Sequence, residues 1–270
     1  MSPDPSFLYR SEQHEEAISN LIYGVQARKG FIVLTGEVGT GKTTMLECLR
    51  DYLYQQSTEF AFIFNSRING QEFLEMVAYD FDLRCDRKSK PEILAALNQM
   101  LVAQVEKGST AVLIVDEAQN LEWDVLEEVR LLGNLENRHG KLLQIVLAGQ
   151  PEFDRKLDAP NLRQLKQRIV LRYNLLPFDQ EDTRRYIESR FSTAGLHNQT
   201  VFSPNLITEI HKRTRGIPRV INAVCDNLLL IAFADASRVA TLEILHEVAA
   251  DMRLDVDSSE RGRDSRQLTS

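Results

Sequence analysis

Residues 36–43 read GEVGTGKT, which matches the phosphate-binding loop pattern G-x-x-x-x-G-K-[ST] at every fixed position. The glycines let the backbone turn tightly, so that successive N–H groups point toward phosphate oxygens. In this pattern the ammonium of Lys42 lies near the β- and γ-phosphates, and the hydroxyl of Thr43 binds Mg²⁺. The motif therefore predicts a nucleotide site. The expected contact residues are Gly36, Glu37, Val38, Gly39, Thr40, Gly41, Lys42, Thr43 and Thr44.

The sequence on either side of this loop supports the prediction. Residues 31–35 are short, apolar and mostly β-branched, as in a buried strand. After the loop, Met45, Leu46 and Leu49 recur at helical spacing. Strand, loop and helix are the context that the motif requires, although a glycine-rich turn without a ligand is the alternative interpretation.

A second motif, AVLIVDE at residues 111–117, combines an apolar run with two carboxylates. The run predicts a buried central strand, and Asp116 at its carboxyl end would lie beside the water shell of a bound Mg²⁺. Glu117 is then the candidate that orients or deprotonates the attacking water. Apolar strands that end in Asp-Glu are common, so the assignment depends on the phosphate loop upstream.

The composition is that of an ordinary globular protein, with 43% hydrophobic and 26% charged residues among 270. A net charge of -7 argues against a general attraction to nucleic acid or anionic lipid, although it leaves a local basic face open. No segment approaches the ~18 apolar residues of a membrane span, so we expect no direct membrane insertion. The three cysteines are widely separated and predict free thiols in a reducing cytoplasm.

The alternation of elements predicts an α/β fold with a parallel five-stranded sheet and a second, all-helical lid. The predicted strands cover residues 31–35, 60–64, 111–115, 142–148 and 169–173. Helices are expected at 11–28, directly after the phosphate loop, and at 71–81, 91–106 and 125–135 in the first part. In the lid they are expected at 179–191, 204–213, 218–234 and 242–252. The predicted domains are 1–177 for nucleotide binding, 178–252 for the lid and 253–270 for a disordered tail.

A sheet domain with a phosphate loop, followed by a small helical domain, is the outline of the AAA+ ATPases. More specifically, five blocks resemble the ATPase domain of the general secretion pathway protein A family. They are GFIVLTGEVGTGKTT (30–44), DEAQNLEWDVLEEVRLLGNLEN (116–137), KLLQIVLAGQPEF (141–153), LRQLKQRIVLRYNLLPF (162–178) and GIPRVINAVCDNLLL (216–230). The resemblance implies ATP and Mg²⁺ as ligands, and no Asn/Thr-Lys-x-Asp element for guanine is present.

The same resemblance implies a place in a bacterial secretion, pilus or exopolysaccharide export system. Members of the secretion branch carry a transmembrane segment and a periplasmic peptidoglycan-binding part after the ATPase, and neither appears in this sequence. We therefore expect a stand-alone cytoplasmic ATPase, and recruitment to the inner membrane by a protein partner is left open.

Two polar positions acquire roles only through this resemblance. Gln150 matches the sensor that contacts the γ-phosphate or the attacking water, although AAA+ proteins more often have Asn, Ser or Thr there. A loop-capping amide is the alternative for Gln150. Arg219 matches the lid arginine that contacts the γ-phosphate, with a solvated surface arginine as the alternative.

Arg168 and Arg163 match the region in which AAA+ proteins place an arginine finger that reaches the neighbouring subunit's site. Arg168 is the first choice and Arg163 the second; a solvated basic face is the alternative. A finger supplied by another subunit implies a homo-oligomer.

Three functions remain open at this stage. The favoured one is a motor or assembly ATPase that acts on envelope or export machinery. The second is a DNA-directed helper of the transposition or replication-initiator type, for which neither a basic loop nor a helix-turn-helix stands out. The third is a regulatory switch whose output is the nucleotide state itself.

Overall fold

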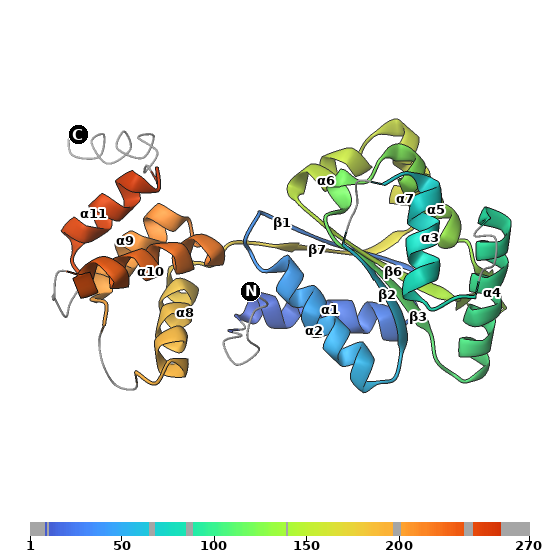
Figure 1. The fold of residues 1–270 in the computed structure, drawn as a ribbon, viewed down its shortest axis with the longest axis horizontal. Coiled ribbons are helices and arrows are strands. Elements are labelled where there is room, and N and C mark those ends of the chain that lie inside the picture. The colour runs from blue at the N-terminus through green and yellow to red at the C-terminus, as the bar shows by residue number, and fades with distance from the viewer. Residues whose placement is uncertain are drawn as a thin grey trace, which may run out of the picture. The chain divides into compact units, whose positions relative to one another are not determined.

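The computed structural model describes Tyr9 and residues 11–64, 68–84, 89–138, 140–196, 201–234 and 240–254. These residues belong to two compact units (Figure 1). The sheet unit runs from Glu12 to Leu176, and the helical unit combines the chain from Pro177 onward with residues up to Ser11. Each unit has a hydrophobic core of its own.

The sheet unit is built on five parallel strands in the order β2-β3-β6-β1-β7. The strands are β1 (Phe31–Gly36), β2 (Glu59–Ile63), β3 (Ala111–Val115), β6 (Leu143–Gly149) and β7 (Ile169–Leu175). β1 lies between β6 and β7, and β3 pairs with β6 on the other side. The predicted parallel five-stranded sheet is confirmed, and its order brings the ends of β1, β3 and β6 next to one another.

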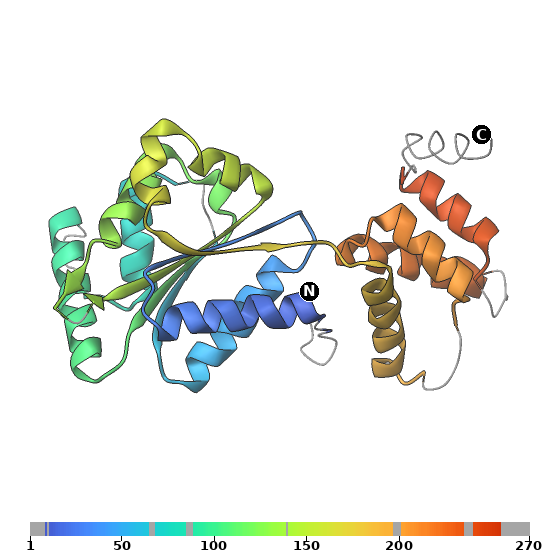
Figure 2. The ribbon, with the colours of Figure 1, turned by 180° about the vertical axis from the view of Figure 1, so that it is seen from behind.

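Helices cover both faces of the sheet (Figures 1 and 2). α1 (Glu12–Gln26) and α2 (Lys42–Gln55) pack on one face against Ile32 and Leu34 of β1. Phe31 and Val33 point to the opposite face, because successive side chains of a strand alternate. The helices on that face are α3 (Gly70–Asp80), α4 (Lys90–Glu106), α5 (Trp123–Leu132), α6 (Pro151–Leu157) and α7 (Arg163–Lys166). Strands buried on both sides explain the near-continuous apolar runs in the sequence.

The region between β3 and β7 differs from the sequence prediction. The helix expected to continue to residue 135 ends at Leu132, and Gly133 follows where a Cβ would come within 2.2 Å of Phe31 Cε2. Residues that were expected only to end this helix form a short antiparallel pair, β4 (Glu136–Asn137) with β5 (Gly140–Lys141). Two short 3-10 helices were also not predicted from the sequence: η2 (Ala118–Asn120) and η3 (Pro160–Leu162).

The helical unit contains α8 (Gln180–Thr193), α9 (Pro204–Thr214), α10 (Pro218–Ala234) and α11 (Leu242–Asp251). Three of these helices begin at a residue whose side chain accepts a backbone N–H bond: Asp179, Ser203 and Thr241. Tyr9, from the N-terminal end, packs edge-on against Phe178, with ring centroids 5.7 Å apart. Tyr9 therefore contributes to the helical core rather than to the sheet unit.

The chain after α11 is described only as far as Leu254. Arg253 and Leu254, which the sequence analysis placed in the tail, still belong to the helical unit, where Leu254 packs on the core and its N–H donates to Ala249 O at 2.8 Å. The rest of the disordered tail predicted at 253–270, residues 255–270, lies outside the described residues, as does Cys85.

Candidate active site

The phosphate-loop sequence forms the turn between β1 and α2. Gly39 and Gly41 have φ values of 85° and 109°, a region that side chains with a Cβ rarely adopt. At Gly36 the limit is space, because an added Cβ would lie 2.5 Å from the carbonyl oxygen of Leu175 on β7. The loop glycines thus fit a backbone that must turn sharply and leave its N–H groups turned toward a ligand.

The ammonium of Lys42 lies inside this turn. It donates hydrogen bonds to the carbonyl oxygens of Gly36, at 2.8 Å, and Glu37, at 3.0 Å. Burial lowers the pKa of Lys42, and the negative charges of Glu117 and Asp116 oppose that shift. Lys42 is therefore a buried cation that loop carbonyls hold at the place where phosphates are expected.

Asp116 lies directly beyond β3 and faces the start of α2. Its carboxylate accepts hydrogen bonds from the hydroxyl of Thr43 at 3.0 Å and from the backbone N–H of Glu117 at 2.8 Å. Burial raises the pKa of Asp116, and these two hydrogen bonds oppose the shift. A hydroxyl beside a carboxylate is a donor set that suits Mg²⁺, which takes one or two protein oxygens together with water and phosphate oxygens.

The described residues contain no cluster of three or more His, Cys, Asp or Glu side chains that would hold a metal by itself.

Glu117 has a left-handed backbone, with φ 53° and ψ 39°, which is uncommon for a residue other than glycine. Two side-chain amides donate to the same carboxylate oxygen, Oε2: that of Gln119 at 2.5 Å and that of Gln150 at 3.2 Å. Gln150 is the residue before α6, but its side chain does not cap that helix. The carboxylate that the sequence analysis chose for water activation is thus held by the expected sensor amide and by a second amide that it overlooked.

His14 on α1 is another residue that the sequence analysis missed. It is buried, and its Nε2 lies 3.2 Å from the carbonyl oxygen of Thr40 in the phosphate loop. A Cβ on Gly41 would come within 2.9 Å of the same nitrogen. The signal was present in the sequence, because His14 continues the apolar face of Ile18 and Leu21 at helical spacing and so predicts a buried imidazole.

The rest of the loop varies in exposure. Val38 is half exposed, Glu37 and Thr43 are exposed, Thr40 is buried, and Thr44 is partly buried at the start of α2.

The three arginines of the sequence analysis lie apart from this cluster or in the other unit. Arg168, which precedes β7, donates to the carbonyl oxygen of Arg130 on α5 at 3.2 Å. Arg163 is exposed at the start of α7 and makes no ion pair within the part of the chain that the structure describes. Arg219 is exposed in the first turn of α10 and belongs to the helical unit.

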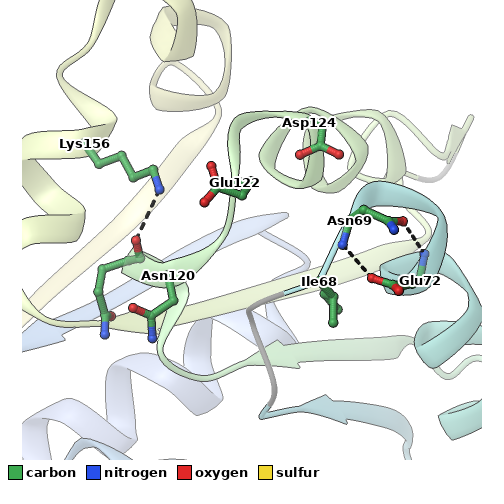
Figure 3. A pocket seen from close by; sticks show the side chains of 8 residues that line it. Ile68, Asn69, Glu72, Asn120, Glu122, Asp124 and Lys156 are labelled. Carbon is green, nitrogen blue, oxygen red and sulfur yellow. Dashed lines mark hydrogen bonds between the residues drawn. The ribbon is translucent and has the colours of Figure 1, made fainter.

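A broad polar pocket of about 880 Å³ opens next to Gln119, between the ends of β2 and β3 and the helices that follow them (Figure 3). Its lining is mostly acidic or amide-bearing, and Lys156 of α6 reaches into it beside Glu122 (Figure 3). Lys156 donates to the backbone carbonyls of Gln119, at 3.2 Å, and Leu121. The pocket wall and the Glu117 cluster therefore share the residue Gln119.

Comparison with known families agrees with this fold. Residues 25–157 match the family model described as an AAA domain. Over 238 residues the chain is 44% identical to general secretion pathway protein A of Aeromonas hydrophila, a match that covers 88% of this chain and 43% of that protein. The chain thus spans less than half of the length of this curated relative.

Solved structures share the fold at low identity. The Cdc6p protein of Pyrobaculum aerophilum aligns with a TM-score of 0.71 and 18% identity, covering 92% of this chain and 69% of that one. The ORC2 protein of Aeropyrum pernix (TM-score 0.64, 14% identity) covers 93% and 72%, and the RuvB Holliday junction branch migration motor of Thermotoga maritima (0.59, 16%) covers 92% and 73%. At these identities the likeness concerns the fold alone.

Fold, site and domain match together define a P-loop nucleotide-binding protein of the AAA type. Within that class, the chain belongs with the general secretion pathway protein A family, as the resemblance of its sequence blocks implied. No helix among the described residues has the length and apolar character to cross a membrane.

Proposed function

We propose that this chain hydrolyses ATP at the cluster formed by Lys42, Thr43, Asp116, Glu117 and Gln150. The observation that supports the proposal is their convergence: the loop after β1, the Asp-Glu pair after β3 and the glutamine after β6 lie at adjacent strand ends of one parallel sheet. Ligands of open α/β sheets bind at such carboxyl ends. A phosphate cradle, a metal-facing acid and a water-orienting carboxylate are the parts that phosphoryl transfer to water requires.

Each residue has a distinct task in this mechanism. Lys42 exchanges its loop carbonyls for phosphate oxygens and stabilises their charge, while Thr43 and Asp116 would hold Mg²⁺. When bound, the metal ion neutralises charge on the phosphates. Glu117 orients the attacking water, and Gln150 holds the Glu117 carboxylate in place.

The proposal is tested by steady-state ATP turnover and nucleotide binding in the wild type and Glu117→Gln. We expect the variant to bind ATP with wild-type affinity and to lose turnover, because only the water-orienting charge is removed. Glu122→Gln is a matched control, since Glu122 is another nearby carboxylate but faces the adjacent pocket. Equal losses of binding and turnover in Glu117→Gln would contradict the role given to Glu117.

We further propose that the active form is a homo-oligomer in which an arginine from one subunit completes the site of the next. Arg168 and Arg163 remain the two candidates. The exposed Arg163 is the better placed for contact with a second copy, because Arg168 already donates to the Arg130 carbonyl. A cation supplied in this way contributes about 10³-fold or more to turnover in phosphoryl transfer.

Mixing two inactive variants tests the oligomer directly. Arg163→Ala lacks the proposed finger and Glu117→Gln lacks the water-orienting group, so mixed oligomers would contain some complete sites. Recovery of turnover on mixing supports the proposal. Full activity of Arg163→Ala alone would exclude Arg163 as the arginine that completes the neighbouring site. The same mixing experiment with Arg168→Ala would then test Arg168 in that role.

For the biological role, we propose a cytoplasmic motor or assembly ATPase that serves a bacterial secretion, pilus or exopolysaccharide export system through a protein partner. Support comes from the 44% identity to a protein named for the general secretion pathway. Turnover should rise faster than protein concentration and be indifferent to duplex DNA at moderate salt. Several-fold stimulation by DNA would favour a DNA-directed helper, and very slow turnover with tight ADP retention would favour a nucleotide-state switch.

A further inference from the structure

Gln119 lies two residues beyond Glu117, in η2, and both ends of its side-chain amide are engaged. Its Nε2 donates to Glu117 Oε2 at 2.5 Å, and its Oε1 accepts from the backbone N–H of Gln150 at 3.0 Å. One side chain therefore connects the proposed water-orienting carboxylate to the turn that carries the proposed sensor. Neither the phosphate-loop motif nor the Asp-Glu motif gave it a role.

The orientation of this amide follows from its partners. A backbone N–H can only donate, so the amide oxygen must face Gln150, and the NH₂ group is left to face the carboxylate of Glu117. The amide therefore cannot reverse without losing both hydrogen bonds. We call this pair of hydrogen bonds, one donated to Glu117 and one accepted from Gln150, the Gln119 brace.

The surroundings of Gln119 keep the brace in place. At Gly149, the last residue of β6, an added Cβ would lie 3.0 Å from Gln119 Oε1 and 3.0 Å from Phe153 Cβ. The absence of a side chain at this position thus leaves room for the amide. On the other side, the ammonium of Lys156 donates to the backbone carbonyl of Gln119 at 3.2 Å. Three elements, η2, β6 and α6, fix where the amide lies.

We propose that Gln119 is a positioning residue that sets the direction of the Glu117 carboxylate for water attack; this inference rests on the proposed ATPase function. A glutamate side chain has three rotatable bonds, and Glu117 sits on an uncommon left-handed backbone. Two amide donors on a single carboxylate oxygen restrict that freedom. Small misplacements of a reacting group lower rates by as much as about 100-fold.

The deciding variant is Gln119→Glu. It keeps an oxygen to accept the N–H of Gln150, but it replaces the NH₂ donor by a second negative charge that repels Glu117. We expect kcat per folded molecule to fall about 10- to 100-fold, with KM and ATP affinity within about twofold of wild type. A residue with only a structural role would lower the melting temperature and leave kcat per folded molecule unchanged.

Asn120→Asp is the matched control. It makes the same amide-to-carboxylate change one residue further along, on a side chain that lines the pocket, and it should leave kcat unchanged (Figure 3). Gly149→Ala is a second route that displaces Gln119 without altering its chemistry, and it should lower kcat in the same direction. Together the two variants separate the position of the amide from the effect of added charge.

The outcomes distinguish this inference from the function on which it rests. Wild-type turnover that is lost in Glu117→Gln but retained within twofold in Gln119→Glu would overturn the role of Gln119 and leave the ATPase intact. Equal losses in Gln119→Glu and Asn120→Asp would likewise overturn it, because charge alone would then explain the effect. A wild type without turnover would overturn both proposals.

Discussion

Replacement of Gly216 by alanine should destabilise the helical unit strongly. Gly216 has a φ of 69°, and a Cβ built there would lie 1.9 Å from the carbonyl oxygen of Phe178. A left-handed backbone costs a residue with a Cβ about 1–2 kcal/mol. Because the clashing atom belongs to the backbone, no side-chain rotation relieves it, and overpacking adds about 1–3 kcal/mol. The expected loss is therefore about 2–5 kcal/mol of the free energy of unfolding.

Gly195→Ala separates the two contributions. Gly195 also lies in the helical unit with a positive φ, 91°, but nothing lies within 4 Å of the Cβ position. We expect Gly195→Ala to lower the free energy of unfolding only by the cost of the left-handed backbone, about 1–2 kcal/mol. Urea unfolding followed by far-UV circular dichroism measures both variants. The single tryptophan, Trp123, reports on the sheet unit in the same experiment.

Equal losses in the two glycine variants would refute the steric reasoning. The N–H of Phe178 also donates to the carbonyl oxygen of Gly216 at 2.9 Å, so a displaced residue 216 would break this contact as well. Since α10 begins two residues later at Pro218, the start of the helix that carries Arg219 depends on the same glycine.

Four further predictions concern the site and its surroundings. Lys42→Ala removes a charged donor, so ATP binding should weaken about 12- to 150-fold in a fluorescence titration, given about 1.5–3 kcal/mol for such a hydrogen bond. Unchanged affinity would contradict the place given to Lys42. His14→Phe removes the contact with Thr40 and should weaken ATP binding about 2- to 12-fold, equivalent to about 0.5–1.5 kcal/mol. Glu15→Gln, a change at the exposed neighbouring residue, is the control and should have no effect. Burial raises the pKa of Asp116, so its ionised form is less favourable in the folded state than in the unfolded chain. Asp116→Asn should therefore raise the melting temperature at neutral pH without nucleotide, and a lowered melting temperature would contradict this direction. The same variant should abolish the Mg²⁺-dependent part of ATP affinity. Burial raises the pKa of Cys225 from 9.0 to about 12. The contribution of this thiol to the free energy of unfolding is therefore full below pH 9 and is lost as pH rises toward 12. Urea unfolding at several pH values should show this decline in the wild type and less of it in Cys225→Ser.

The sheet was predictable because the periodic signals of its elements are strong. Buried parallel strands give unbroken apolar runs, and the glycine spacing of the phosphate loop reflects backbone angles that few other residues adopt. Short elements were less predictable. The 3-10 helix η2 and the hairpin of β4 and β5 span two or three residues per element, too few for any periodicity to develop.

The candidate site residues also differ in how far the sequence predicts them. Contiguous motifs predicted Lys42, Thr43, Asp116 and Glu117 as candidate site residues, whereas the prediction of Gln150 needed the family resemblance. Gln119 lies inside the sequence block 116–137 that resembles the family, but the sequence analysis assigned no role to it. Its amide proved to lie between Glu117 and Gln150 only in the structure. Its function depends on a contact across 31 residues of chain, and no local pattern records such a contact.

The sequence by itself thus determined the phosphate loop, the acidic strand end and the parallel α/β class, because each depends on neighbouring residues and on local backbone geometry. Only the tertiary structure decided which side chains surround Glu117, that His14 contacts the loop, and that Arg168 is already engaged while Arg163 is exposed. The physical reason is the order of the strands. β1, β3 and β6 are far apart in sequence but adjacent in the sheet, so the contacts among their ends exist only after the sheet has formed.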